Sequence, residues 1–166
     1  MPPFAKGGEK IGLSVGTVLG NMLSKEKRLM QGSGVQGPGS RDKESLSYIC
    51  SHLASKLSLA GPRITVSTAC ASGTDAIGIA SRKIASGKAD LMIAGGVDVL
   101  SDFSVIGFHT LQAITEDKVR PFDKYRTGLA LGEGAAFAVL ETEQSALTRG
   151  VKIYGRIGEV FGSKGL

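Results

Sequence analysis

Apolar side chains fall into short runs and periodic stripes that predict separate strands and helices. The segment from Ile11 to Leu19, rich in apolar and small residues, predicts a buried strand. A loop rich in Gly and Ser follows, from Gln31 to Ser40. Beyond it, Asp42 can cap a helix of about four turns, in which apolar side chains recur at spacings of three and four. The members of this stripe are Leu46, Ile49, Cys50, Leu53 and Leu57.

The middle of the chain predicts a strand, a helix and a second strand in succession. Ile64 to Thr68 is rich in β-branched residues, which favours a short strand. Ser72 to Ser86 has the helical period and is followed by Gly87, where a left-handed helix cap is expected. The buried strand Leu91 to Ala94 should then end at a pair of glycines. Two strands joined by one helix should run parallel, so the pattern indicates an α/β fold.

The last third of the chain repeats these signals. Arg120 to Ala135 mixes charged residues with Gly and Pro and predicts an ordered loop. Ala135 to Glu141 predicts a further buried strand, and Thr142 can cap a short helix that ends at Gly150. Val151 to Val160 predicts a last strand.

Length and composition limit the class of protein. With 166 residues, 42% of them apolar and 21% charged, the chain is typical of one globular domain or part of one. Its apolar runs are far shorter than the roughly 20 residues of a membrane-spanning helix, and its first residues lack the features of a secretory signal. We therefore expect a cytoplasmic protein with no membrane span and with reduced cysteines.

Twenty basic against fifteen acidic side chains leave a formal charge of +5. This excess is modest and spread along the chain, which is typical of a solvated surface, and no strip of basic and aromatic residues suggests nucleic acid. The two cysteines and two histidines stand too far apart for a metal site. We expect no metal.

Cys70 is the residue best placed for chemistry. It lies where the strand Ile64 to Thr68 turns into the next helix, and a helix start favours thiolate over thiol. The small neighbours Ala71, Ser72 and Gly73 leave room for an electrophilic carbonyl, and the amide of Cys70 could donate to an oxyanion. Buried packing is the alternative for this cysteine, as it is the expectation for Cys50.

Two long motifs carry a resemblance to a known family. They are GPRITVSTACASGTDAIGIASRKIASGKADLMIAGGVD and, later, RPFDKYRTGLALGEGAAFAVLE. Together they resemble the β-ketoacyl synthases, the condensing enzymes of fatty acid and polyketide synthesis in the thiolase-like superfamily. The resemblance runs from about Ile11 to Val160 and implies a layered α/β/α fold. We expect residues 1–166 to form a single incomplete domain, the N-terminal half of a condensing-enzyme fold.

The resemblance also implies an activity, that of an acyltransferase. Cys70 would take an acyl group from a carrier thioester, and a malonyl thioester would lose carbon dioxide to give the carbanion that attacks it. Phe108 matches an aromatic residue near the acyl pocket, and Ala71, Ser72 and Gly73 would contact substrate. Substrates would arrive on the phosphopantetheine of an acyl carrier protein, so the chain itself would bind no cofactor.

The resemblance reaches only the N-terminal half of such a synthase. The two histidines and the lysine that complete condensation in the family belong to its second half. His52 and His109 match neither of the family's catalytic histidine motifs, and we expect a surface or packing role for His52. We therefore expect the isolated chain to be incompetent for full condensation.

Two other functions stay open. A thiolase would use the same fold and a cysteine nucleophile but would take coenzyme A thioesters. A non-catalytic dimerisation or partner subunit would keep the fold without turnover. The expected partners are an acyl carrier protein and, in addition, either a second copy in a homodimer or a complementary C-terminal half. Basic candidates for binding the acidic carrier protein are Lys25, Lys27, Arg28, Arg41 and Lys43.

Overall fold

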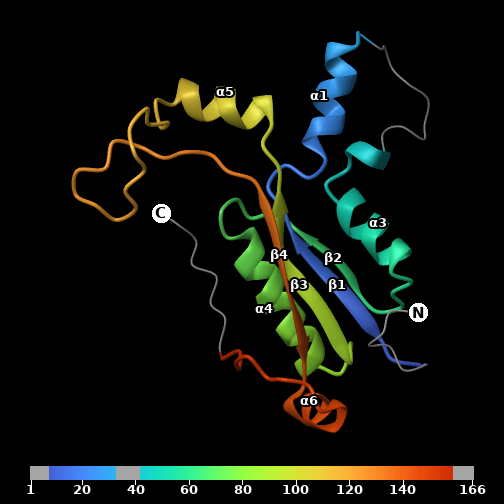
Figure 1. Ribbon diagram of the computed structural model, residues 1–166. Helices are drawn as coiled ribbons and strands as arrows, with labels where there is room; N and C mark the ends of the chain where they lie inside the picture. Colours follow the sequence, from blue (N-terminus) through green and yellow to red (C-terminus); the bar gives the residue numbers. More distant parts are fainter. Residues whose placement is uncertain (1–7, 33–41, 159–166) are drawn as a thin grey trace.

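A computed structural model of the chain describes residues 8–32 and 42–158, and its centre is a four-stranded sheet (Figure 1). The strands lie in the order β2-β1-β3-β4. They span Ile11–Gly16 (β1), Arg63–Val66 (β2), Leu91–Asp98 (β3) and Gly134–Glu141 (β4). β1 pairs in parallel with both β2 and β3, and β4 runs antiparallel to β3. The predicted parallel arrangement is confirmed, with β1 inserted between the two strands.

Helices pack on both faces of this sheet, and further helices lie beyond its two ends (Figure 1). Their bounds are Met22–Met30 (α1), Asp42–Glu44 (η1, a 3₁₀ turn), Tyr48–Lys56 (α3), Ser72–Ala85 (α4), Asp102–Thr110 (α5) and Glu143–Arg149 (α6). Cys50 and Ala54 of α3 pack with Leu13 of β1 on one face. Ala80 of α4 packs with Met92 of β3 on the opposite face, because neighbouring side chains of a strand alternate between faces.

Predicted and observed elements agree best where local capping signals are strong. α4 occupies the predicted helix, and Gly87 follows it with φ 66°. Thr142 caps α6 by accepting a hydrogen bond from the Ser145 amide at 3.2 Å, and Gly150 ends it with φ 65°. None of the helices in the described ranges is long and apolar enough to cross a membrane.

The prediction of a four-turn helix that begins at Asp42 is wrong. A short 3₁₀ turn comes first, and α3 begins only at Tyr48. The hydroxyl of Ser45 accepts a hydrogen bond from the Ser47 amide at 3.3 Å, which gives the backbone an alternative to the helix. Leu46 is consequently 44% exposed, and the buried part of the predicted stripe narrows to the centre of α3.

The strand predictions also need correction at their ends. β1 stops at Gly16 rather than Leu19, because the residues after it turn toward the end of β3. β3 does not end at its glycine pair but continues to Asp98. Gly95 suits this strand, since a Cβ there would lie 2.0 Å from the carbonyl oxygen of Ala136 on β4.

Of the last two predicted strands, the first forms but is less buried than predicted, and the second does not form in the described residues. β4 forms at one edge of the sheet and is mostly exposed: Leu140 is buried, but Val139 is 53% exposed. The strand predicted over Val151 to Val160 is absent from its described part, residues 151–158. Nothing in the described chain pairs with this segment, and a strand needs a partner to satisfy its backbone.

The candidate nucleophile turn

The turn between β2 and α4 is fixed by hydrogen bonds on both sides of Cys70. The Thr68 amide donates to the hydroxyl of Ser72 at 2.9 Å, and that hydroxyl donates to the carbonyl of Ala69 at 2.6 Å. The Thr68 hydroxyl donates to the carboxylate of Asp75 at 2.6 Å, in the first turns of α4. Ala69 has φ 54°, in the left-handed region that a residue with a side chain rarely adopts. These contacts hold Cys70 at a sharp bend.

The two cysteines have opposite surroundings. Cys70 is exposed at the bend, two residues before the start of α4. Cys50 is only 2% exposed, and its thiol donates to the carbonyl of Ile64 at 3.3 Å. Burial raises the pKa of the Cys50 thiol, so this group stays protonated. Of the two, Cys70 is the one that a reagent in solution can reach.

Close backbone packing fixes α4 against the sheet beside the bend. A Cβ on Gly16 would lie 2.3 Å from the carbonyl oxygen of Ser72, so β1 can approach the helix start only with glycine there. Gly73 in turn faces Gly96 of β3. The N-terminal end of α4 therefore rests directly on the backbone of the two central strands.

The carboxyl ends of the three parallel strands meet at the edge of the sheet that carries Cys70. Asp98, the last residue of β3, points its carboxylate to the loop after β1. It accepts hydrogen bonds from the Thr17 hydroxyl at 2.9 Å and from the Val18 amide at 3.0 Å. Sequence reasoning missed Asp98. A carboxylate at the carboxyl end of a parallel strand is a signal that could have found it.

The remaining predicted site residues are distributed over two elements. Ala71 and Gly73 flank the helix start and are half-buried, whereas Ser72 is 3% exposed and uses its hydroxyl within the turn. Phe108 lies on α5, after the end of β3, and is 38% exposed. Substrate contact by these four residues stays a prediction.

The two histidines lie on helices other than the one that follows this turn. His52 is exposed on α3 and stacks on the ring of Tyr48, with the ring centroids 5.3 Å apart. His109 is exposed near the end of α5. Within residues 8–32 and 42–158, no three His, Cys, Asp or Glu side chains group so that they could hold a metal ion.

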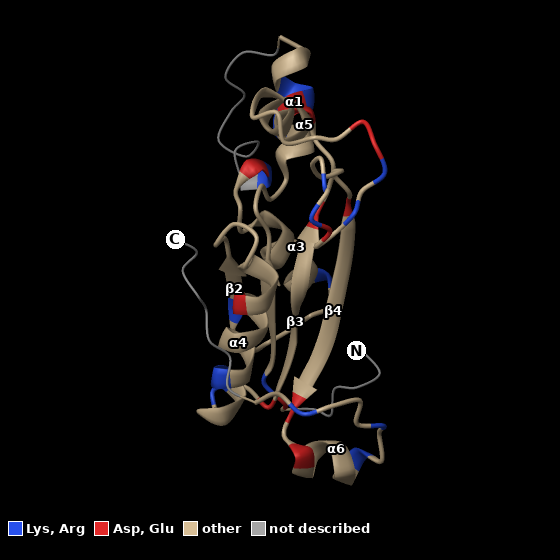
Figure 2. Cartoon of the chain, turned by 90° about the vertical axis from the view of Figure 1, so that its left-hand side faces the viewer, with Lys and Arg blue, Asp and Glu red and all other residues tan. Residues whose placement is uncertain are grey.

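The basic candidates for a carrier-protein contact gather around α1 and η1. Lys25 and Lys27 are exposed on α1, and Lys43 is exposed on η1. Arg28 instead forms an ion pair with Glu44, which ties α1 to η1. Figure 2 shows basic and acidic residues close together in this region, as in the sequence of α1, where Glu26 stands between Lys25 and Lys27. Arg41 lies outside the described residues.

Comparison with known proteins identifies the family. Residues 3–146 match the family described as beta-ketoacyl synthase, N-terminal domain. The chain belongs to the β-ketoacyl synthase family. It is 33% identical over 159 residues to 3-oxoacyl-acyl-carrier-protein synthase 2 of Vibrio cholerae serotype O1. That alignment covers 89% of this chain and 38% of the relative, so the chain spans well under half of that protein.

Solved structures confirm the thiolase-like fold for this part of a synthase. A beta-ketoacyl synthase from Burkholderia phymatum matches with a TM-score of 0.75 and 34% identity, over 90% of this chain and 40% of that one. A type II polyketide ketosynthase solved with its acyl carrier protein matches with a TM-score of 0.80 and 27% identity. The latter match covers 93% of this chain and 42% of that one. The expected N-terminal part of a condensing-enzyme fold is thereby confirmed.

Proposed function

We propose that Cys70 is the acyl-accepting nucleophile of a β-ketoacyl-acyl carrier protein synthase. The observation that carries this proposal is the exposure of Cys70 at a fixed strand-to-helix bend, two residues before α4 begins. The positive end of the helix dipole stabilises negative charge on a sulfur at such a place. Family membership adds the expected use of the thiolate, which is attack on a thioester.

In the first step the Cys70 thiolate attacks the carbonyl carbon of an acyl thioester. The new bond joins the sulfur of Cys70 to this carbon, and the bond to the carrier's phosphopantetheine sulfur breaks, so that the carrier leaves as a thiolate. The amide of Cys70 is the proposed donor to the oxyanion formed in between. Ala71 and Gly73 are small, which leaves room for the acyl carbonyl beside the sulfur.

In the second step a malonyl thioester loses carbon dioxide, and its carbanion attacks the acyl carbon. A carbon–carbon bond forms and the Cys70 thiolate leaves. Stabilising the carbanion requires charged or hydrogen-bonding groups close to it. Since His52 and His109 lie on other elements and are exposed, we propose that this chain performs only the first step and that a complementary C-terminal half supplies the groups for the second.

The natural carrier distinguishes this function from that of a thiolase. We propose an acyl carrier protein as the partner, because 3-oxoacyl-acyl-carrier-protein synthase 2 is among the chain's relatives and because one related ketosynthase was solved with such a carrier. Exposed Lys25, Lys27 and Lys43 are the proposed contacts for its acidic surface. Faster transfer from acyl-coenzyme A than from acyl carrier protein would favour the thiolase instead.

Intact-protein mass spectrometry tests the first step. We expect the purified chain, mixed with an acyl carrier protein thioester, to gain the mass of one acyl group, located on Cys70 by peptide mapping. Cys70→Ser should abolish this gain, whereas Cys50→Ala should retain it, because Cys50 is buried and its thiol is protonated. Acylation that survives in Cys70→Ser, or an unmodified Cys70 in the folded chain, contradicts the proposal.

A further inference from the structure

The loop after β1 lies between the end of β3 and the turn that holds Cys70, and it forms hydrogen bonds on both sides. Asp98 binds this loop at two consecutive backbone amides: both its oxygens lie 3.0 Å from the Val18 amide, and one lies 3.3 Å from that of Leu19. The Thr17 side chain adds a further bond to Asp98 and is itself only 1% exposed. The Thr17 hydroxyl, which donates to Asp98, also accepts a hydrogen bond from the Gly20 amide at 3.0 Å. The Asp98 carboxylate therefore holds residues 17–19 directly and Gly20 through Thr17.

The same loop contacts the strand that leads to Cys70. The Thr17 amide donates to the carbonyl of Val66, the last residue of β2, at 3.0 Å. The hydroxyl of Ser67 donates to the carbonyl of Val18 at 3.4 Å. A displacement of the loop would therefore displace the chain just before the bend.

Gly16, the last residue of β1 before this loop, contacts the chain after Cys70. Gly16 packs against the backbone of Ser72 so closely that no side chain would fit between them. Residues 16–18 thus touch the chain on both sides of the bend, and Asp98 fixes residues 17–19 from the opposite side. This arrangement is a continuous set of contacts from the end of β3 to the turn.

We propose that Asp98 is a positioning residue that fixes the Cys70 turn through the loop of Thr17 and Val18. The inference rests on the proposed function only in treating Cys70 as the nucleophile. Asp98 does not touch the substrate in this proposal. Its carboxylate keeps the sulfur and the helix-start amides in the relative positions that thioester attack requires.

The test is Asp98→Asn, which keeps the size of the side chain and removes its charge and one acceptor. We expect acylation of Cys70 at saturating acyl carrier protein thioester to slow by about tenfold, with little change in the half-saturating concentration, because misplacement affects the reaction rather than binding. Hydrogen exchange measured by mass spectrometry should accelerate in the peptide covering residues 67–73. Asp90→Asn is the matched control, since Asp90 accepts a hydrogen bond from the Lys10 amide at 2.7 Å at the opposite end of β3.

A conservative pair tests the route through the loop. Thr17→Ser keeps the hydroxyl that bonds Asp98 and should behave like the unaltered chain, whereas Thr17→Val removes it and should reproduce the Asp98→Asn effects. The proposal is overturned if Asp98→Asn matches Asp90→Asn in both measurements, or if exchange accelerates equally across the whole sheet. Exchange at residues 67–73 needs no acylation, so it decides this inference even if the unaltered chain fails to accept an acyl group.

Discussion

The contact of Gly16 with the start of α4 shows how much a single residue constrains the candidate site. Helix and strand meet here backbone to backbone, without side chains in between. Gly73, in the first turn of α4, lies at the same junction, but a Cβ there would be 3.8 Å from the nearest atom, which is an ordinary contact. Two glycines at one junction therefore have unequal importance.

Replacing each of these glycines by alanine should separate the two roles. We expect Gly16→Ala to lower the free energy of unfolding by about 2 kcal/mol or more, because backbone must shift to admit the methyl group. Gly73→Ala should be close to neutral, since alanine is the better helix former. Urea unfolding followed by circular dichroism measures both. Equal stability of the two variants would show that the close approach at Gly16 is not rigid.

The sequence pointed to Cys70 but not to Asp98, because the signals for Cys70 come from neighbouring residues and those for Asp98 from residues far apart along the chain. The strand-to-helix turn around Cys70 is encoded by neighbouring residues, which a local pattern displays. The bond between Asp98 and Thr17 joins residues 81 positions apart, and only the pairing of β1 with β3 brings them together. The shared edge of parallel strands was predictable, but which side chains meet there was not.

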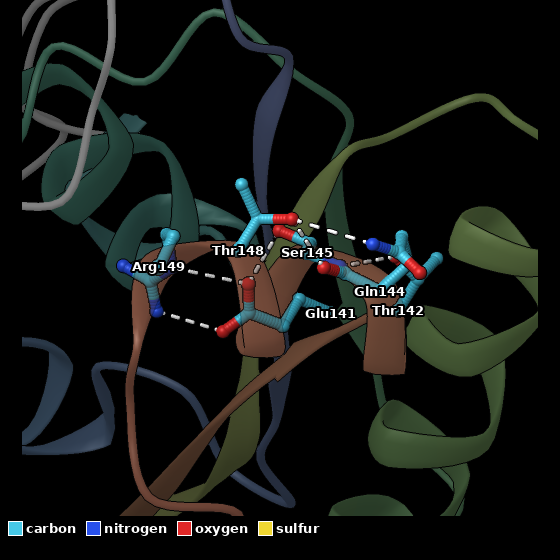
Figure 3. A network of polar contacts seen from close by, with 6 residues as sticks. All are labelled: Glu141, Thr142, Gln144, Ser145, Thr148 and Arg149. Atoms are coloured by element: carbon cyan, nitrogen blue, oxygen red, sulfur yellow. Dashed lines mark hydrogen bonds and ion pairs between the residues drawn. The ribbon is translucent and has the colours of Figure 1, made fainter.

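Among the elements, α6 is held to the end of β4 by a small polar network (Figure 3). Glu141, the last residue of β4, accepts hydrogen bonds from Arg149 at 2.7 Å and from the Ser145 hydroxyl at 2.6 Å. Burial of the Glu141 carboxyl opposes its ionisation, but the hydrogen bonds from Arg149 and Ser145 outweigh this effect and keep its pKa below the ordinary value. The network thus favours the charged carboxylate.

This lowered pKa gives stability a pH dependence of definite sign. The folded chain holds the Glu141 proton less tightly than the unfolded chain, so the stabilisation is complete above the unfolded pKa of about 4.3 and is lost as pH falls through the lower folded value. Arg149→Gln should cost about 1–2 kcal/mol in urea unfolding near pH 7 and much less near pH 3.

Arg156→Gln is the control for this prediction. Arg156 pairs with Glu143, but the side chains of this pair are 77% and 50% exposed, so solvent screens their interaction. We expect no measurable loss of stability at either pH. A loss in Arg149→Gln that is the same at both pH values would contradict the role of the Glu141 charge.

The elements that the sequence predicted well are those whose ends carry their own signals. α4 and α6 each end at a glycine in the left-handed region, Gly87 and Gly150, and both were placed within a residue or two. The predicted helix from Asp42 failed because Ser45 interrupts it locally. The burial of β4 was mispredicted for another reason: an apolar sequence does not say whether a further element covers it in this chain.

On the scale of the whole molecule, α5 is an apolar helix that the described chain leaves largely exposed. It extends beyond the sheet near α1 (Figure 1), and none of its residues is buried. Yet it is mostly apolar, with Phe103 61% and Ile106 64% exposed, and Leu111 just after it is 75% exposed. Helices of this composition are ordinarily covered. We therefore expect this surface to bind a second copy of the chain.

Sedimentation velocity tests this expectation on the isolated chain. We expect self-association at micromolar concentration, weakened by Ile106→Lys, which places a charge in the exposed apolar surface. His109→Lys is the control, because His109 is an exposed polar residue on the same helix. A chain that sediments as a single monomeric species across the concentration range would show that α5 does not mediate association with itself.

The left-handed backbone at Ala69 has a consequence for how the protein can change. Alanine pays a steric penalty of roughly 1 kcal/mol at φ 54°, and glycine would not. Ala69→Gly is therefore the simplest stabilising replacement in this region, and it lies directly before the candidate nucleophile. The same replacement would widen the range of conformations open to Cys70. Selection for thermal stability would therefore favour glycine at position 69, and selection for rapid acylation of Cys70 would favour alanine.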